Sequence, residues 1–371
     1  MTEQNSHIII DNGTGFIKAG LSGEKSPKII FPTCVGYPKY GGGRISLKKK
    51  EFYVGYEAES IQGVLKTNNP IEQGVVNNWD DMEKIWGYTF TDKLKLNQSE
   101  YNIMTTETPM NPKENKEKMT QIMFEAFNVK GLYIANESIL SLYSVGKCTG
   151  ISVDSGNGIT NFSPIFEGCI LPHAVFRTNL AGKNLTEYLI KILSDKNVKF
   201  STSADKEIIK AIKEKVCYVS LDFEKEINSV ESYNYELPDG SNIALKEERI
   251  QCPEALFKPY LIGKQGDGIG KMCFNSMNKC NSDIQKEIFR NIILSGGNTM
   301  FNGLRERFEN EVKNLFNNNM KDEVKVISPP EQRNAVWIGG SLLSNSSFDS
   351  KWITKTEYQE YGVLIVHRKC F

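Results

Sequence analysis

Apolar residues recur every three or four positions in several stretches of this chain, which is the pattern of amphipathic helices. The clearest stretches are WDDMEKIWGYTF at 79–90, NKEKMTQIMFEAFN at 115–128 and SADKEIIKAIKEKVCYV at 203–219, the last with a capping-type Ser-Ala-Asp start. Between the helical stretches lie short β-branched runs that end in Gly-containing turns and predict strands. Because strands alternate with helices, the pattern predicts an α/β fold.

Two segments of the chain repeat one another. IIIDNGTGFIKAG at 8–20 and ISVDSGNGITNFSPIF at 151–166 each have an apolar run, then Asp, a small polar residue, Gly, one further residue and Gly. Each predicts a β-hairpin, in which a β-branched strand stops at Asp11 or Asp154, a turn follows and a second apolar run returns. Two matched hairpins in one chain predict duplicated halves.

Other Gly-containing segments show where a strand ends or where the chain leaves the packed frame. IILSGGNTMFNGL at 292–304 predicts a strand, a turn and the start of the helical stretch LRERFENEVKNLF. KYGGGRISLKKKEF at 39–52 predicts a mobile loop, and INSVESYNYELPDGSN at 227–242 predicts a polar turn region. We expect both to be excursions from the α/β frame rather than linkers between independent domains.

Size and composition narrow the class of protein. A chain of 371 residues predicts about two domains. Lys+Arg and Asp+Glu balance at 45 each, which argues against a global attraction to nucleic acid or to a membrane surface. The start MTEQNSH has no apolar signal region, and no run of 18 apolar residues occurs. The eight scattered cysteines form no CxxC pair, so we expect reduced thiols and a cytoplasmic or nuclear protein.

The matched hairpins have the chemistry of a phosphate and metal site. Consecutive Gly-containing turns expose backbone N–H groups that bind phosphate oxygens, and an Asp at the end of each strand orients a hydrated Mg²⁺. Lys18 lies three residues after Gly15, where its ammonium can reach phosphate oxygens. A single such turn is more often an ordinary tight hairpin. Duplication of the turn together with its Asp has no folding rationale, so the pair favours a nucleotide site.

Two common nucleotide motifs are missing. No G-x-x-x-x-G-K-[ST] occurs and no G-x-G-x-x-G follows a first strand, so neither a P-loop nor a dinucleotide fingerprint is present. GKQGDGIGK at 263–271 lacks both spacings and predicts a surface loop. The three histidines, His7, His173 and His367, are far apart in sequence with no recognisable triad partner, which argues against nucleophilic hydrolase chemistry.

The chain resembles actin from end to end. The resemblance is carried by the two hairpins and by YPKY, YVGYEAES, NPIEQGVVNNWDDMEKIW, NPKENKEKMTQIMFEAFN, LSLYSVGKCTG, LAGKNLTEYLIKIL, IKEKVCYVSLDFE, YELPDGSNI, CPEALF, LSGGNTMF, ISPPEQRNAVWIGGSLL and VHRKCF. It implies the actin-like ATPase fold: two duplicated α/β domains, each with two subdomains, around a nucleotide cleft. The outer domain would comprise 1–136 and 334–371, with a small subdomain at about 33–69. The inner domain would comprise 137–333, with a small subdomain at about 181–260.

The resemblance also implies the residues of a nucleotide site that takes ATP or ADP with Mg²⁺ or Ca²⁺. Asp11 and Asp154 would hold the metal through water. Lys213 and Glu214 match adenosine contacts of the family, although without the resemblance they would be read as a solvated helix face. The full set of implied nucleotide-binding residues is Gly13, Thr14, Gly15, Phe16, Lys18, Gly156, Asn157, Gly158, Gly182, Lys213, Glu214, Gly297, Asn298, Met300, Phe301 and Arg333.

This chain departs from the family pattern at the positions expected to order the attacking water. Glu137 stands where the family has glutamine, Asn161 where it has histidine, and Asn157 where it has aspartate. Glu137 has three open roles: a general base, a closer metal ligand, or a like charge that repels the γ-phosphate. Asn161 is either a neutral replacement or a loss of water ordering. We expect nucleotide binding to persist and hydrolysis to be slow.

Departures in interaction surfaces leave the cellular role open. Actin-like chains insert the loop at 39–52 into a neighbour and bridge strands through an apolar loop tip near 261–271, where this chain has Lys264. The leading expectation is a cytoskeletal, filament-forming subunit that contacts itself or other actin subunits. The alternative is a non-polymerising actin-related subunit of a larger complex, such as a chromatin remodeller. A sugar kinase on the same fold is disfavoured, since no further substrate-site acid stands out. Actin-binding proteins would dock at a cleft near Tyr143, Gly146, Gly168, Ile338 and Leu342.

Overall fold

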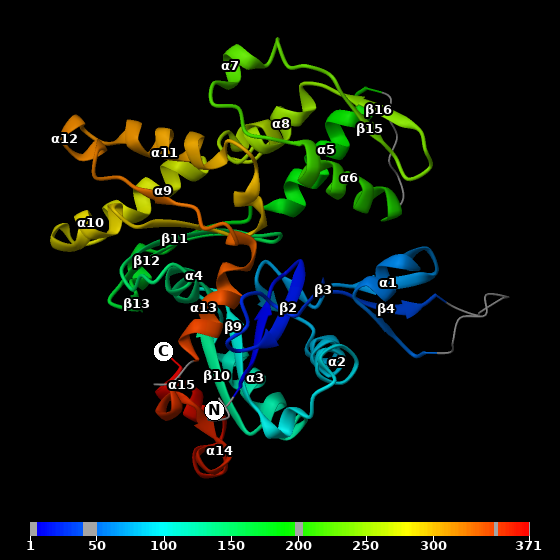
Figure 1. The fold of residues 1–371 in the computed structure, drawn as a ribbon, viewed down its shortest axis with the longest axis vertical. Helices are drawn as coiled ribbons and strands as arrows, with labels where there is room; N and C mark the ends of the chain where they lie inside the picture. Colours follow the sequence, from blue (N-terminus) through cyan, green and yellow to red (C-terminus); the bar gives the residue numbers. More distant parts are fainter. Residues whose placement is uncertain (1–5, 40–49, 197–202, 345–347, 371) are drawn as a thin grey trace. The chain divides into compact units, whose positions relative to one another are not determined.

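The computed structural model describes residues 6–39, 50–196, 203–344 and 348–370 (Figure 1). Residues 40–49, which form most of the predicted loop at 39–52, lie outside the described part. The chain divides into two compact units: unit 1 comprises Met1–Cys148 and Asn334–Phe371, and unit 2 comprises Thr149–Arg333.

The first predicted hairpin lies in the main sheet of unit 1. The strand order is β19-β10-β9-β1-β2-β3, with β1 antiparallel to β2 and parallel to β9. In the hairpin Asp11 pairs with Lys18, and Ile9 pairs with Gly20. The bounds are β1 (Ile8–Asn12), β2 (Phe16–Leu21), β3 (Ile29–Pro32), β9 (Asn102–Glu107), β10 (Gly131–Asn136) and β19 (Ile353–Thr354).

Helices of unit 1 pack on this sheet through the apolar faces that the sequence predicts. The Asn78 side chain accepts a hydrogen bond from the Asp81 N–H and caps α2, whose Ile85 and Trp86 are buried. The predicted helix at 115–128 ends earlier, since Asn128 has a left-handed φ of 52°. The helices are α1 (Tyr56–Ser60), α2 (Trp79–Tyr88), α3 (Lys113–Glu125), α4 (Glu137–Tyr143), α13 (Ala335–Leu343), α14 (Lys355–Tyr361) and α15 (Val366–Lys369).

Unit 2 repeats the hairpin in its own sheet. The strand order is β13-β12-β11-β17-β18, with β14 also paired to β12. Asp154 pairs with Asn161 across the hairpin, and Ser152 pairs with Ser163. The bounds are β11 (Gly150–Ser155), β12 (Thr160–Phe166), β13 (Cys169–Ile170), β14 (Phe176–Thr178), β17 (Ile292–Ser295) and β18 (Val326–Ile327).

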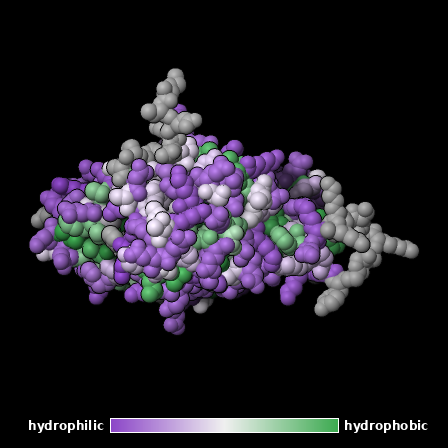
Figure 2. All heavy atoms as spheres, turned by 90° about the horizontal axis from the view of Figure 1, so that it is seen from below, coloured by the Kyte–Doolittle hydropathy of each residue, from purple (hydrophilic) through white to green (hydrophobic). Residues whose placement is uncertain are grey.

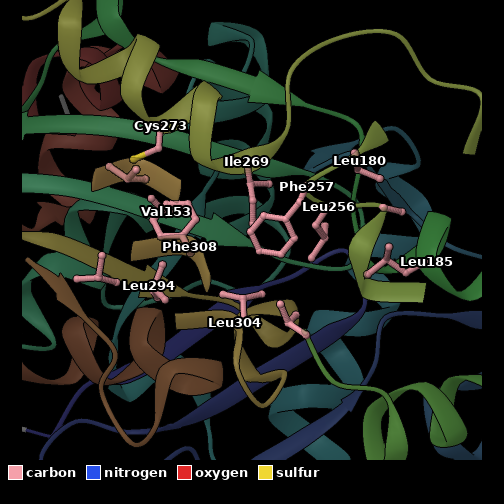
Figure 3. Close-up of a cluster of buried hydrophobic side chains, with 14 of the residues drawn as sticks. Val153, Leu180, Leu185, Leu256, Phe257, Ile269, Cys273, Leu294, Leu304 and Phe308 are labelled. Carbon is pink, nitrogen blue, oxygen red and sulfur yellow. The ribbon is translucent and has the colours of Figure 1, made fainter. Parts of the chain in front are cut away.

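One hydrophobic core supports the unit 2 sheet. Figure 3 shows Val153 and Leu294 of the strands close to Phe308 and Cys273 of the covering helices. Burial of this apolar surface is the main stabilising contribution to the unit. The helices are α5 (Gly182–Ser194), α6 (Ser203–Val216), α7 (Phe223–Glu226), α8 (Glu248–Glu254), α9 (Ile269–Asn278), α10 (Ser282–Phe289), α11 (Leu304–Leu315) and α12 (Asn318–Lys321).

Three small sheets complete the described structure. The sheet β5-β4-β6 has its own core of Cys34, Tyr53, Ala58 and Leu65. The predicted polar turn region at 227–242 contains β15 and the first residue of β16, which pair as an antiparallel hairpin. In β16, the buried Ile243 and Leu245 alternate with exposed residues, so one face of the strand is buried. The bounds are β4 (Val35–Pro38), β5 (Tyr53–Val54), β6 (Leu65–Asn68), β7 (Ile71–Glu72), β8 (Val75–Val76), β15 (Tyr233–Glu236) and β16 (Asn242–Leu245).

The division between the units falls after Cys148, so the segment 137–148 belongs to unit 1. The segment in question contains α4, which packs against α13 of unit 1 in a core that includes Leu140 and Trp337. The two helices are so close that a Cβ added at Gly339 would lie 1.8 Å from the Leu140 carbonyl oxygen. This close contact fixes α4 to unit 1.

The surface drawn in Figure 2 is mainly hydrophilic, with hydrophobic residues in small separate groups. Within the described ranges, no helix combines the length and the apolar character needed to cross a membrane. All eight cysteines are free thiols, and only Cys148 and Cys169 are exposed.

Candidate functional site

The first hairpin places Asp11 in a hydrogen-bonded, charged pair. Asp11 is buried, and its Oδ2 lies 2.8 Å from the Lys18 Nζ. The Thr106 hydroxyl, from the neighbouring strand β9, donates to Asp11 Oδ1 at 3.3 Å. Both carboxylate oxygens therefore have donors, and the lysine offsets the buried charge.

The turn after Asp11 presents backbone donors. Its carbonyl oxygens accept from Thr33: the Thr33 hydroxyl donates to the Gly13 oxygen at 2.7 Å, and the Thr33 N–H donates to the Gly15 oxygen at 3.1 Å. Within the described residues, the N–H groups of Gly13, Thr14 and Gly15 have no acceptor. A Cβ at Gly13 would lie 2.7 Å from the Phe16 oxygen, so the turn requires glycine there. Unpaired N–H groups in a turn form an anion-binding concavity.

The turn of the second hairpin has the same arrangement. Its carbonyl oxygens accept from the start of α5: Gly182 N–H donates to Gly156 O at 3.0 Å, and Lys183 N–H donates to Asn157 O at 2.9 Å. The Asn298 amide also donates to Gly156 O, at 2.6 Å. In the described part of the chain, the N–H groups of Asn157 and Gly158 have no acceptor. This turn too is held by its carbonyls and leaves its donors available.

Asp154 is positioned by a residue far away in the sequence. The hydroxyl of Ser295, at the end of β17, donates to Asp154 Oδ2 at 2.6 Å. Asn161 is directly opposite Asp154 in the hairpin and is fully buried. Unit 2 therefore brings the candidate metal residue Asp154 together with the candidate catalytic residue Asn161.

Lys213 is a buried cation with neutral partners. Only 4% of its surface is exposed, and its Nζ donates to the Gly182 oxygen at 2.9 Å and to the Thr186 hydroxyl at 3.0 Å. Burial lowers the pKa of Lys213 because water no longer solvates the ammonium. Its neighbour Glu214 is exposed. A face of α6 that looks solvated in the sequence thus carries one buried cation, which a polar ligand would stabilise.

The Gly turn at the end of β17 adds a more open surface. Gly297 is exposed, and a Cβ there would meet no atom within 4 Å among the described residues. Met300 is 46% exposed although apolar, and Phe301 is half-buried. Arg333 lies near this turn, because Gly296 N–H donates to the oxygen of its neighbour Gln332 at 3.1 Å. These residues offer an apolar surface beside polar groups.

Glu137 is the first residue of α4, where the Asn136 side chain caps the helix by accepting from the Ser138 N–H at 3.0 Å. It belongs to unit 1, together with Asp11, the first turn and Lys18. The other candidate site residues belong to unit 2.

A family model described as Actin matches residues 2–371. The chain belongs to the actin family. The predicted actin-like α/β fold is confirmed, with its duplicated hairpins in two units. Members of the actin family generally bind a nucleotide and a divalent cation, so both turns can be tested for their fit to these ligands.

The residues present fit a metal-bound nucleotide. The unpaired N–H groups of both turns suit phosphate oxygens, and the buried ammonium of Lys213 has a donor to spare. Within the described residues, no three His, Cys, Asp or Glu side chains gather as a metal cage. Mg²⁺ commonly keeps several waters and takes only one or two carboxylates with phosphate oxygens. Asp11 in unit 1 and Asp154 in unit 2 are each a carboxylate of the kind that can take part in such a site.

Sequence reasoning missed three hydroxyl residues that position this machinery: Thr106, Thr186 and Ser295. Each acts on a residue that is distant in the chain, so no local motif contains the pair. Ser295 lies at the end of the apolar strand predicted in 292–304, whereas no predicted element ends at Thr106 or Thr186.

Of the five residues expected to receive actin-binding proteins, four belong to unit 1 and one, Gly168, belongs to unit 2. Tyr143 of α4 and Ile338 of α13 pack at the edge of one apolar core, and Leu342 is 51% exposed. Gly146 has a left-handed φ of 69°. Gly168 lies in unit 2, in the turn between β12 and β13.

Proposed function

We propose that this chain is a cytoskeletal actin-family protein that binds ATP with a divalent metal through the turns of both units, polymerises, and hydrolyses ATP slowly. The observation that carries the proposal is the pair of glycine turns with unpaired N–H groups, each beside a hydrogen-bonded aspartate. This arrangement supports phosphate binding in a chain that belongs to the actin family.

Each part of the chain has a role in this proposal. The turn amides and Lys18 bind phosphate oxygens, and Asp11 and Asp154 would hold the divalent metal through water. Lys213, Glu214 and Arg333 bind the sugar and base, with Met300 and Phe301 as apolar cover. Glu137 and Asn161 order the attacking water. When bound, the divalent metal neutralises phosphate charge.

The binding step is tested by calorimetry of nucleotide-stripped protein with Mg-ATP. We expect wild type to bind, and Lys213→Met to bind at least about tenfold more weakly, because a hydrogen bond to a charged group contributes about 1.5–3 kcal/mol. Lys206→Met is the matched control, since Lys206 is an exposed lysine of the same helix. Absence of heat with wild type would refute the proposal.

One observation favours the alternative, a non-polymerising subunit of a larger complex. The Nζ of Lys264, in the loop where actin-like chains have an apolar tip, donates to the Asn179 oxygen at 3.0 Å. Burying this lysine at a subunit interface would cost desolvation energy. Pelleting with Mg-ATP and raised salt decides between the two proposals. Sedimenting polymer supports a filament subunit with a cytoplasmic role. No sedimenting polymer at tens of micromolar protein supports the subunit of a larger complex, for which the nucleus is the alternative location.

A further inference from the structure

In the sheet of unit 2, one face of β11 and β12 packs into the hydrophobic core, and the other face carries several polar side chains. Ile151, Val153 and Phe162 point into the hydrophobic core. Side chains alternate along a strand, so the neighbouring residues lie on the opposite face. We call this the Asp154 face, and it carries Ser152 and Asp154 of β11 with Ser163 and Asn161 of β12.

The duplicated hairpin of unit 1 differs at the corresponding positions. Two residues before Asp11 is Ile9, which pairs with Gly20 and packs in an apolar core with Trp337. Two residues before Asp154 is Ser152, which pairs with Ser163. Unit 2 thus has two hydroxyls where unit 1 has apolar packing.

The hydroxyl of Ser152 is unsatisfied in the described structure. Ser152 is 0% exposed, and its Oγ has no hydrogen-bond partner among the described residues. Buried polar groups are nearly always hydrogen-bonded to protein or to ordered water. Side chains directly opposite in an antiparallel pair have Cβ atoms about 4.5–5.5 Å apart, so one water can bridge the two serines. A buried water needs two to four polar partners, and the hydroxyls of Ser152 and Ser163 can act as two of them because a hydroxyl both donates and accepts.

We propose that Ser152 and Ser163 bind an internal water on the Asp154 face, and that this water holds Asn161 in the orientation that orders the attacking water. The second half of the proposal rests on the proposed ATPase function. Ser152 and Ser163 act through Asn161, so they are positioning residues. Asn161 belongs to the next pair on the same face, two residues closer to the turn, where it lies opposite Asp154.

The test compares Ser152→Val with Ser152→Thr, which have the same shape but differ in the hydroxyl. We expect a crystal structure of wild type and of Ser152→Thr to show a water between residues 152 and 163, and Ser152→Val to lack it. The rate of phosphate release by Ser152→Val should fall about 2- to 12-fold, which is the change expected from losing the net free energy of one hydrogen bond. Ser152→Thr should retain the wild-type rate and its pH profile. Ser163→Ala provides a second variant should Ser152→Val fold poorly.

Ile293→Val is the matched control, because Ile293 pairs with Ser152 from β17 on the same face. It should change neither the water nor the rate. A wild-type structure without the water would overturn the inference, as would equal rates and pH profiles for Ser152→Val and Ser152→Thr. Failure of wild type to bind ATP in calorimetry would instead refute the proposed function and the role of Asn161, while the crystal density would still decide the water.

Discussion

Replacing Gly339 by alanine should separate α4 from α13 and destabilise unit 1. A Cβ at Gly339 would lie 1.8 Å from the Leu140 oxygen and 2.6 Å from the Leu140 carbonyl carbon. Both atoms belong to the backbone, so no side-chain rotation can relieve the overlap. The helices must move apart, which loosens the packing of Leu140 against Val336 and Trp337.

The magnitude follows from two opposing effects. Overpacking of a well-packed core costs about 1–3 kcal/mol, and a backbone overlap belongs at the upper end. Alanine is favoured over glycine in a helix by about 1 kcal/mol, which offsets part of the cost. The net loss is about 2 kcal/mol, or roughly 4–8 °C in Tm for a unit of this size.

Thermal unfolding monitored by circular dichroism measures the shift. Gly63→Ala is the matched control, because a Cβ at Gly63 would meet no atom within 4 Å in the described structure. We expect Gly63→Ala to unfold within about 2 °C of wild type, the range of a surface substitution. The reasoning is wrong if both variants unfold at the same temperature. Since α4 begins with Glu137, Gly339→Ala should also slow any phosphate release.

Three further predictions concern single side chains. Burial lowers the pKa of His7 from 6.5, so the folded protein favours the neutral imidazole. The free energy of unfolding should therefore decrease as the pH falls below about 6.5. His7→Gln should make the free energy of unfolding, measured in urea between pH 5 and 7, depend less on pH. Glu137→Ala should reduce phosphate release by about 100-fold or more if Glu137 is a general base, whereas an unchanged rate would eliminate that role. Burial raises the pKa of Cys370 to about 12, so its thiol should react slowly. A maleimide at pH 7 should label the exposed Cys148 and Cys169 and leave Cys370 unmodified until the chain unfolds. Rapid labelling of Cys370 in the native protein would contradict its burial.

The duplicated hairpins could be predicted from sequence, because each is a local pattern of strand, turn and strand. The pattern ends each strand at Asp11 or Asp154, and in the structure each strand continues by one further residue, to Asn12 and Ser155. The hairpin of β15 and β16 was missed because its exposed positions make the segment polar on average, although Ile243 and Leu245 alternate correctly.

Local patterns failed where a residue is defined by a distant neighbour. Lys213 looks solvated on its helix, yet the start of α5 and Thr186 bury its ammonium. Ser295 meets Asp154 only because β17 pairs with β11 in parallel. The packing of α4 likewise depends on α13, which comes almost 200 residues later in the chain. Periodicity identifies each helix or strand and its apolar face, whereas contacts between elements decide what surrounds each side chain.

The two hairpins also differ in charge, and this difference assigns them unequal roles toward a metal. In the first hairpin the Lys18 ammonium lies 2.8 Å from Asp11 and offsets its charge. In the second, the position of Lys18 is taken by Asn161, and residues 150–166 contain no lysine or arginine. The second hairpin therefore supplies a carboxylate without a cation of its own. A metal near Asp11 must compete with the Lys18 ammonium for the carboxylate, whereas the second hairpin has no lysine at the corresponding position.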